Sequence, residues 1–543
     1  MKRFVLTFVA VMAFLISPAV VDSQQRDSAS AALTALDYYE IEQLYARYCH
    51  GLDSGADDGY MYADVFTPDG TFVDQAGKVR AGREQLAELG RGGPGARRGP
   101  TMISHFVSNV AIEPAAGGAT GKAYLLIAQA PNPAMGLRAT LVNGGQYWDA
   151  LVKTAEGWRF KNRTYHQAHP PAPSASAAPQ ASAPVASTGA IAERRAAKIR
   201  LSAADYADIY QLYGRYGYAF DGGLDTGNEW ARLFTPDGFH SNASNNEWVK
   251  GSVALADFAR GALQYERGFI TLRRLEGSGK DPTRIAHIIT NIMLEPTTEG
   301  VVAKAYRMIA GIGANGQPNS FLTAGMYFDL LVKTPRGWRY KEKFYMGTDI
   351  VPDLAKRFIT PASSGRSADV FPASGAVPNT PPPAAAAGST FTPDEYAELQ
   401  QLYARSSVAL DSSADNGAAY ARWFTSDGVF TDAAGSVFAG RDKLAQVARG
   451  NPGSGKTPTT TQTFLYNLKL QRSAEGATGT AYVVIATIND AGQPITMNDG
   501  GQYHDALVNT AEGWRIKTRK FVRAAPGGVA VPNPIARSQW SPG

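Results

Sequence analysis

Two histidines occupy one position in a segment that the chain repeats three times. The copies read "ISHFVSNVAIEP" (103–114), "IAHIITNIMLEP" (285–296) and "TQTFLYNLKLQR" (461–472). His105 and His287 share this position, and Thr463 takes it in the third copy. Imidazole titrates near neutral pH and often accepts protons in enzymes. The first two copies therefore each carry a candidate general base, although a lone strand His is also typical of a core or interface residue.

An aspartate precedes each of these segments, at the end of a helical pattern. The three helices read "IEQLYARYCHGLD" (41–53), "IYQLYGRYGYAFD" (209–221) and "LQQLYARSSVALD" (399–411), with apolar residues at helical spacing. They end at Asp53, Asp221 and Asp411. The interval from this Asp to the His position is equal in the first and third copies, and an insertion lengthens it in the second. The carboxylate also has a simpler alternative role, which is to cap the turn after its helix.

Asparagines follow the histidines on the same predicted strands. Side chains alternate between the two faces of a strand, so Asn109 should share a face with His105, and Asn291 with His287. We expect both amides to face a cavity and bind substrate. Asn467 stands at this place in the copy without His, which is equally typical of a residue that fixes the sheet.

Helix tyrosines are the remaining candidates for substrate binding. Tyr45, Tyr48, Tyr213 and Tyr216 lie one or two turns before the helix-ending aspartates. A phenol in a pocket can donate a hydrogen bond to a developing enolate or to a departing hydroxyl. Packing in the core is the alternative for these side chains.

The predicted elements follow the same order in each copy. Helices come first, then a Pro/Ser-Asp-Gly turn, a further helix, and strands that close in a hairpin. Asp149, Asp329 and Asp505 stand in that hairpin in all three copies, which favours a shared structural role. Helices followed by hairpin-connected strands predict an α+β unit, with N-terminal helices on one face of a curved, mostly antiparallel sheet.

Two stretches rich in Pro, Ala and Ser divide the chain into three such units. A length of 543 residues suits three domains of roughly 150 residues each. The predicted boundaries are 1–23 for a signal peptide, 24–169 for domain 1, 170–199 for a linker, 200–358 for domain 2, 359–390 for a second linker, 391–525 for domain 3 and 526–543 for a C-terminal tail.

The repeated unit resembles the SnoaL-like group of the nuclear-transport-factor-2-like superfamily, which includes scytalone dehydratase and the hexachlorocyclohexane dehydrochlorinases. The resemblance rests on the Asp that ends the first helix, the "HxxxNxxxE" strand and the "GGxYxD…GWR" hairpin. It implies three tandem cone-shaped α+β domains, each with a sheet that wraps a pocket covered by the helices.

The resemblance also implies a catalytic dyad in the first two domains. Asp53 would pair with His105, and Asp221 with His287. The carboxylate would fix the imidazole tautomer and stabilise the imidazolium, while the base removes a proton next to a carbonyl or a leaving group. The key tyrosines of scytalone dehydratase do not fall on the helix tyrosines of this chain. The chain departs from the family pattern here, so the resemblance does not favour dehydration over other lyase or isomerase reactions.

The N-terminus predicts export. Lys2 and Arg3 precede an apolar stretch (4–16) that is too short to span a bilayer, so 1–23 is typical of a secretory signal peptide. A retained anchor is the alternative. We expect a periplasmic or secreted protein, not associated with a membrane after cleavage. The single cysteine, Cys49, excludes an internal disulfide and fits a buried position.

The composition of the chain limits the kinds of molecule that we expect it to bind. The net charge of +5 comes with no basic block, so we expect no nucleic-acid binding. We expect no metal, because His50, His105, His166 and His169 lack ligand spacing, and no cofactor, because deprotonation needs no electron carrier.

The insertion in copy two is basic, which is typical of a solvated helix or lid, or of a site for an anionic substrate group; its arginines are Arg260, Arg267, Arg273, Arg274 and Arg284.

Together these patterns predict an exported, cofactor-independent lyase or isomerase. His105 and His287 would act as general bases on a small apolar or polycyclic substrate, and domain 3 would lack the base. The alternatives are a non-catalytic protein that binds a hydrophobic small molecule and a self-associating scaffold. We expect the domains to pair within the chain or in a homo-oligomer.

Overall fold

The computed structural model describes thirteen stretches of the chain. These are residues 32–92, 103–129, 140–166, 200–222, 224–242, 247–259, 263–265, 272–274, 285–311, 320–347, 391–450, 461–488 and 495–523. The predicted signal peptide, both linkers, the C-terminal tail, His169, Arg260, Arg267 and Arg284 lie outside these residues.

The described residues of domain 1 form three α-helices and one six-stranded sheet. The helices are α1 (Ala35–Ser54), α2 (Tyr60–Ala63) and α3 (Gly82–Arg91); the strands are β1 (Phe66–Val73), β2 (Val79–Ala81), β3 (Ile103–Ala115), β4 (Gly118–Gln129), β5 (Thr140–Thr154) and β6 (Gly157–His166). The strand order is β2-β1-β6-β5-β4-β3, and only the β1–β6 pair is parallel. β3 therefore forms an edge of the sheet.

Domain 2 repeats this plan. Its helices are α4 (Ala203–Gly222), α5 (Asn228–Ala231) and α6 (Ser252–Ala259); its sheet contains β7 (Phe234–Asn242), β8 (Glu247–Lys250), β11 (Ile285–Pro296), β12 (Val301–Gly311), β13 (Ser320–Thr334) and β14 (Gly337–Gly347). The described parts of the insertion are not the expected helix. They form a two-stranded ladder of β9 (Leu263–Tyr265) and β10 (Leu272–Arg274), and the side chains of Arg273 and Arg274 are not among those described.

Domain 3 is the third copy. It contains α8 (Pro393–Ser412), α9 (Ala418–Ala421), α10 (Arg441–Arg449), β15 (Phe424–Thr431), β16 (Val437–Ala439), β17 (Thr461–Ser473), β18 (Gly476–Thr487), β19 (Thr496–Thr510) and β20 (Gly513–Arg523). The sheet order β16-β15-β20-β19-β18-β17 matches that of domain 1. The structure confirms the predicted fold class, an α+β fold in three tandem copies.

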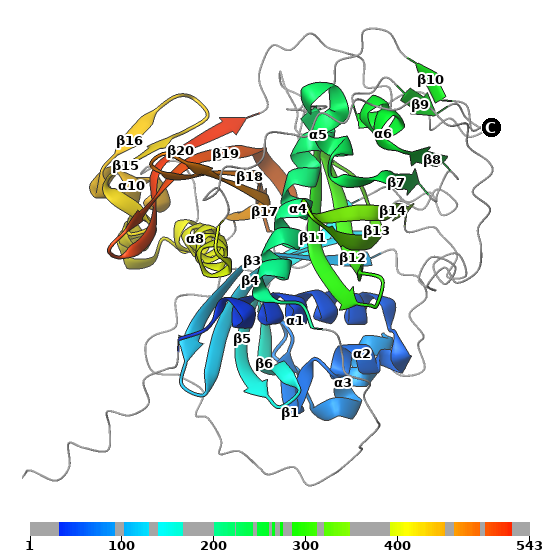
Figure 1. Cartoon of the computed structure of the whole chain (residues 1–543). Helices are drawn as coiled ribbons and strands as arrows, with labels where there is room; N and C mark the ends of the chain where they lie inside the picture. The colour runs from blue at the N-terminus through cyan, green and yellow to red at the C-terminus, as the bar shows by residue number, and fades with distance from the viewer. Residues whose placement is uncertain are drawn as a thin grey trace, which may run out of the picture.

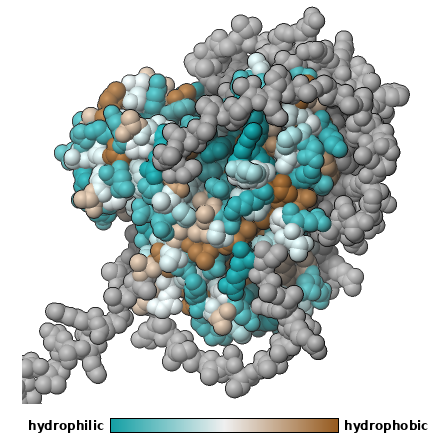
Figure 2. Space-filling model, in the orientation of Figure 1, coloured by the Kyte–Doolittle hydropathy of each residue, from teal (hydrophilic) through white to brown (hydrophobic). Residues whose placement is uncertain are grey.

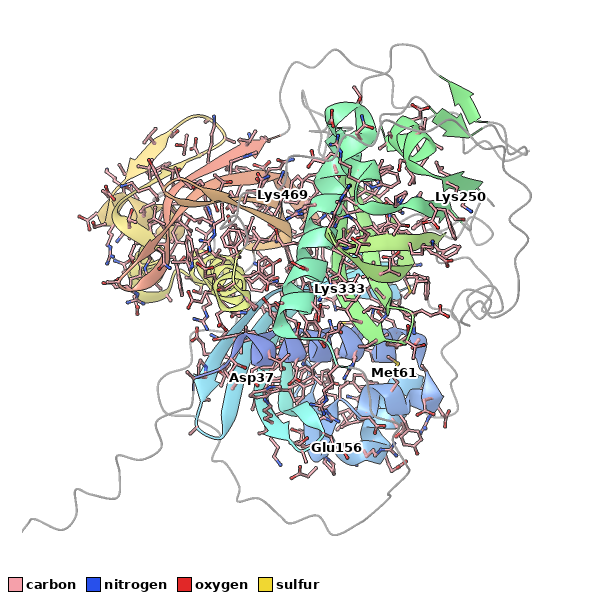
Figure 3. All side chains as sticks on the ribbon, in the orientation of Figure 1. Asp37, Met61, Glu156, Lys250, Lys333 and Lys469 are labelled. Atoms are coloured by element: carbon pink, nitrogen blue, oxygen red, sulfur yellow. The ribbon has the colours of Figure 1, made fainter. Side chains whose placement is uncertain are left out.

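In domains 1 and 2, the long helix is tied to the last hairpin of its own sheet. Thr34 and Asp37 form a capping box at the start of α1. The Asp37 carboxylate also accepts hydrogen bonds from Lys153 Nζ at 2.5 Å and from Trp158 Nε1 at 3.0 Å. Asp205 repeats both contacts in domain 2, with Lys333 and Trp338. Figure 3 labels Asp37 of domain 1 and Lys333 of domain 2. One carboxylate thereby fixes both the start of the helix and its position over the β5–β6 turn.

The three domains surround a common axis (Figure 1). The long helix of each packs against the edge strand of another: α1 on β11, α4 on β17 and α8 on β3. The edge strands β3, β11 and β17 also contact one another at the centre. In the view of Figure 2, apolar residues gather near this junction. Pairing of the domains within the chain is thus a feature of the structure.

Side-chain amides form hydrogen bonds with backbone N–H and C=O groups of the three edge strands. Asn291 of domain 2 donates to the carbonyl of His105 on β3 and accepts from the Val107 N–H, both at 3.0 Å. Gln401 of domain 3 makes the same pair of bonds further along β3, with Val110 and Ile112. Asn467 and Gln43 form the same kind of hydrogen bonds with the backbone of β11, and Asn109 and Gln211 do so with that of β17. Each edge strand is therefore bound by amides from both other domains.

The expectation that Asn109 and Asn291 face the cavity of their own domain is wrong. Both have positive φ, 52° and 53°, at a break in the strand register, and Asn467 repeats this with φ 51°. Such a bulge interrupts the alternation of side chains on which the expectation rested. Asn is one of the few residues that tolerate this backbone conformation, so the same residue both forms the bulge and binds the neighbouring domain.

Removal of one amide should weaken the assembly measurably. Asn467→Gly keeps the positive φ accessible but leaves the His287 carbonyl and the Ile289 N–H without partners. Two orphaned buried groups should lower the free energy of unfolding by about 2–4 kcal/mol. Urea denaturation measures this loss. The same change at exposed Asn498 is the matched control, and equal losses in the two variants would contradict the role of the amide.

Candidate functional site

The carboxylate of Asp53 binds His105 at two points. Its Oδ1 lies 2.5 Å from the ring Nδ1, and its Oδ2 accepts the backbone N–H of the same residue at 2.8 Å. Asp53 comes from the last turn of α1 and His105 from the start of β3, so the contact joins helix to sheet. The His105 side chain keeps 12% of its surface exposed. With Nδ1 held by the carboxylate, Nε2 is the ring nitrogen placed to accept a proton.

Domain 2 has the same arrangement with one addition. The Asp221 carboxylate binds both the Nδ1 and the backbone N–H of His287, and the imidazole is 11% exposed. Arg307 Nη2 lies 3.4 Å from His287 Nε2. Since a guanidinium can only donate, this contact places the ring proton on Nδ1, towards the carboxylate.

Domain 3 keeps the carboxylate without the base. Asp411 accepts the backbone N–H of Thr463 at 2.6 Å and its hydroxyl at 2.8 Å. The Asp therefore fixes the first residues of the edge strand whether or not a His follows. This explains why the Asp is present in all three copies, and why its presence alone does not indicate catalysis.

Each His–Asp pair is bordered by a residue of a second domain. The phenol of Tyr306, on β12 of domain 2, donates to Asp53 Oδ2 at 2.7 Å, and Tyr482 of domain 3 does the same to Asp221 at 2.8 Å. Tyr306 also packs edge-on against His50, with ring centroids 4.4 Å apart. The "AY" motif on the strand that follows each edge strand (β4, β12 and β18) occurs in all three copies. The sequence held no signal that its tyrosine contacts another domain.

The predicted substrate-binding tyrosines are buried and engaged within their own domains. Tyr45 and Tyr213 donate to the hairpin carboxylates Asp149 and Asp329. The hydroxyls of Tyr48 and Tyr216 lie 3.5 and 3.3 Å from those of other buried tyrosines, Tyr147 and Tyr327. The four phenols are thus engaged in the cores of their domains, and Tyr45 and Tyr213 also line a cavity between the domains.

The hairpin aspartates bind buried cations that sequence reasoning missed. Arg163 holds Asp149 through two bonds of 2.7 Å, Lys343 holds Asp329 at 2.8 Å, and Arg519 holds Asp505 at 2.7 Å. In each pair both side chains are essentially inaccessible. Burial lowers the pKa of Lys343 to about 8 against the opposing effect of Asp329. The recurring basic residue fourteen positions after the Asp was the available signal.

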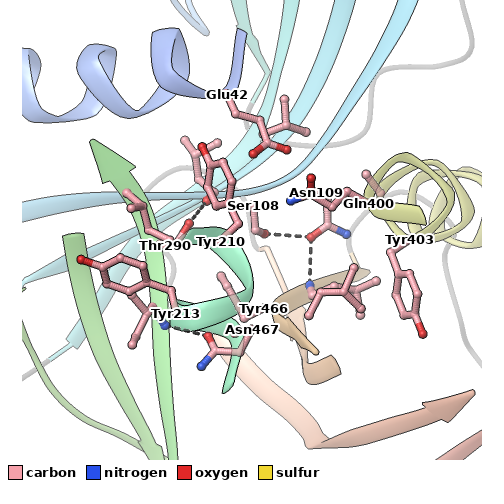
Figure 4. Close-up of a pocket in the computed structure, with 18 of the residues that line it drawn as sticks. Glu42, Ser108, Asn109, Tyr210, Tyr213, Thr290, Gln400, Tyr403, Tyr466 and Asn467 are labelled. Atoms are coloured by element: carbon pink, nitrogen blue, oxygen red, sulfur yellow. Dashed lines mark hydrogen bonds between the residues drawn. The ribbon is translucent and has the colours of Figure 1, made fainter. Parts of the chain in front are cut away.

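A separate cavity of about 180 Å³ lies at the axis where the domains meet (Figure 4). Glu42, Tyr210 and Gln400 occupy equivalent helix positions in the three domains, and all three line it. Burial raises the pKa of Glu42 to about 7, partly offset by a hydrogen bond from Tyr210. This cavity is distinct from the His–Asp pairs, although Asn109, Asn291 and Asn467 also reach it.

The described residues contain no group of three potential metal ligands. Within the same residues, no helix has the length and apolar character needed to cross a bilayer. Each dyad presents an imidazole oriented by a carboxylate, an arrangement that suits general base catalysis.

The fold and site define a class, α+β domains of the nuclear-transport-factor-2-like kind with an interior polar site. The SnoaL-like domain family matches residues 33–164, 202–343 and 393–520. The chain belongs to this family, with three tandem copies, and domains of this kind generally bind small molecules. No curated protein matches the sequence.

Several solved structures are similar to single domains of the chain. An NTF2-like protein with a cystatin-like fold from Novosphingobium aromaticivorans is 19% identical over 23% of this chain and 79% of its own, with a TM-score of 0.20. ActVI-ORFA from Streptomyces coelicolor is 23% identical, over 23% and 93%, with a TM-score of 0.20. A protein from Catenulispora acidiphila is 27% identical, over 24% and 91%, with a TM-score of 0.22.

The buried His50, which packs against Tyr306 near the Asp53–His105 pair, should make the protein sensitive to acid. Its Nε2 donates to the Asn291 carbonyl at 2.9 Å, and burial lowers its pKa to about 4 from 6.5. The unfolded chain therefore takes up this proton first, and stability falls as the pH drops from 6.5 to 4. The loss from His50 should approach about 3 kcal/mol.

Comparison of urea denaturation at pH 7 and pH 4 tests this expectation. His50→Gln, which keeps a donor but does not titrate, should lose less stability on acidification than the unchanged chain. His504→Gln, at an exposed imidazole, should keep most of the loss. An unchanged acid loss in the His50 variant would refute the assignment.

Proposed function

We propose that domains 1 and 2 are cofactor-independent lyase or isomerase domains that abstract a proton from a small molecule. The observation that carries this proposal is the Asp–His contact. In both domains a helix-end carboxylate holds Nδ1 and the backbone N–H of a partly exposed imidazole, and in domain 3 a Thr replaces that imidazole. The Thr463 N–H and hydroxyl bind Asp411 in domain 3, so a purely structural clamp at this position does not require an imidazole.

The proposed step is a deprotonation next to an electron-withdrawing group. The Nε2 of His105 or His287 takes a proton from carbon, and the C–H electron pair moves into a new C=C bond. In an elimination, the pair that joined the leaving group to the adjacent carbon departs with it. In an isomerisation, the imidazolium returns the proton to a different carbon. No net electrons are transferred, so the step needs no redox partner.

The carboxylates stabilise the imidazolium that this step creates. Asp53 lies at 2.5 Å from Nδ1, and its second oxygen is already held by Tyr306 and by the backbone. The pair is therefore organised before substrate arrives, which lowers the cost of placing positive charge on the ring. The half-buried rings near His287, such as Phe220, suit an apolar substrate body.

A non-catalytic role in binding small molecules is the second candidate. It is favoured by domain 3, which keeps the fold, the Asp and the buried Asp505–Arg519 pair without a base. Proton exchange separates the two candidates, because binding alone does not labilise a C–H bond.

Hydrogen–deuterium exchange at carbon tests the catalytic proposal without knowledge of the full reaction. The full chain is incubated in D₂O with a panel of enolisable carbonyl compounds, and deuterium uptake is followed by NMR. At least one compound should exchange faster with the protein than in buffer. The His105→Ala/His287→Ala variant should lose about 10²–10⁴-fold of that acceleration.

Controls make this experiment specific. Thr463→Ala, at the same position in domain 3, should leave exchange unchanged, and each single His variant reports the contribution of its own domain. If the double His variant retains the full acceleration, the dyads are not catalytic.

We also propose that the chain is exported. The support is the sequence alone, two basic residues before an apolar stretch that ends in small residues near Ser23. N-terminal sequencing of the protein made in its native host should begin near residue 24. A product that starts at Met1 and stays with the cytoplasmic fraction would contradict this expectation.

A further inference from the structure

Arg307 distinguishes the interior of domain 2 from those of the other two domains. It lies on β12 directly after Tyr306, and the corresponding residues are Leu125 on β4 and Val483 on β18. Those two are 1% exposed and apolar, whereas Arg307 is 8% exposed and charged. Burial of an uncompensated charge is costly, so an Arg in a position that elsewhere holds an aliphatic side chain requires a reason.

The guanidinium of Arg307 is only partly satisfied. Its Cζ lies 3.9 Å from the ring centroid of Tyr345, and its Nη2 is 3.4 Å from His287 Nε2. Nε and Nη1 are buried and have no hydrogen-bond partner among the described residues. A buried guanidinium with unused donors is typical of a site for a carboxylate or another planar anion.

The charges around the dyads also differ between the two domains. The described interior of domain 1 holds two carboxylates, Asp53 and Asp149, and one buried cation, Arg163, which binds Asp149. In domain 2, two carboxylates, Asp221 and Asp329, face two cations, Lys343 and Arg307. When these carboxylates and cations alone are counted, the described interior of domain 2 is one unit more positive. An anion entering domain 1 meets net repulsion, and one entering domain 2 does not.

We propose that domain 2 binds an anionic substrate, a small carboxylic acid whose carboxylate is held by Arg307, while domain 1 takes a neutral one. This inference rests on the proposed function for the role of His287. Because the guanidinium touches Nε2, the acidic C–H lies within a few bonds of the carboxylate. On binding, the Arg307 guanidinium shifts from Nε2 to the substrate carboxylate, which frees the Nε2 lone pair. Nε2 then takes the proton, the C–H pair forms the C=C bond of an enolate, and the π pair of the adjacent ketone moves to its oxygen. Arg307 faces the added negative charge.

Binding to the full chain tests the anion site independently of turnover. Calorimetry is run with levulinate, which carries a ketone and a carboxylate, and with its uncharged methyl ester. Levulinate should bind saturably, and Arg307→Leu, which installs the domain 1 residue, should weaken it about 10- to 100-fold without changing the ester. Arg307→Gln is the second variant in case Leu perturbs folding. Arg232→Leu, at a half-exposed Arg of the same domain, is the control.

Two results overturn the inference: no saturable binding of levulinate, or equal affinities in the unchanged chain and both Arg307 variants. Exchange of levulinate C–H bonds in the His105→Ala background, where only domain 2 can act, gives the second readout. Arg307-dependent binding without any His287-dependent exchange would sustain the anion site and refute the catalytic proposal. Arg307-dependent binding with exchange that Arg307→Leu slows for levulinate but not for the ester supports both.

Discussion

The structure depends on the hydrogen bonds that side-chain amides make to strand edges with no neighbouring strand in their own sheet. An unpaired edge strand presents N–H and C=O groups that must be satisfied or covered. Here Asn and Gln side chains from two neighbouring domains supply those bonds to β3, β11 and β17. The result is a closed ring of three domains, in which no domain completes its own sheet edge.

The same bonds place the candidate catalytic groups. The carbonyl of His105 is held by Asn291, its N–H and Nδ1 are held by Asp53, and Tyr306 holds the far oxygen of that carboxylate. Two of these four contacts cross a domain boundary. A base oriented in this way loses little freedom when it accepts a proton, and its geometry depends on the assembly as much as on its own domain.

The sequence was sufficient for the fold and insufficient for the contacts between domains. Repeated patterns predicted three α+β units, and the family resemblance implied the pairing of Asp53 with His105. Strand alternation failed at Asn109 because a bulge reverses it, and a bulge depends on the partner strand. Arg307 and Tyr306 escaped notice because a lone Arg or Tyr in an apolar strand gives no sign of what lies opposite it.

Linking the three copies covalently has a consequence at the axis. In a trimer of identical chains, every residue on the symmetry axis occurs three times, and three copies of Glu42 would bring three carboxylates into one cavity of about 180 Å³. In this chain a phenol and an amide, Tyr210 and Gln400, take the other two places. In a chain with three tandem copies, a substitution at one position lining the cavity therefore does not change the two equivalent positions, and each can evolve separately.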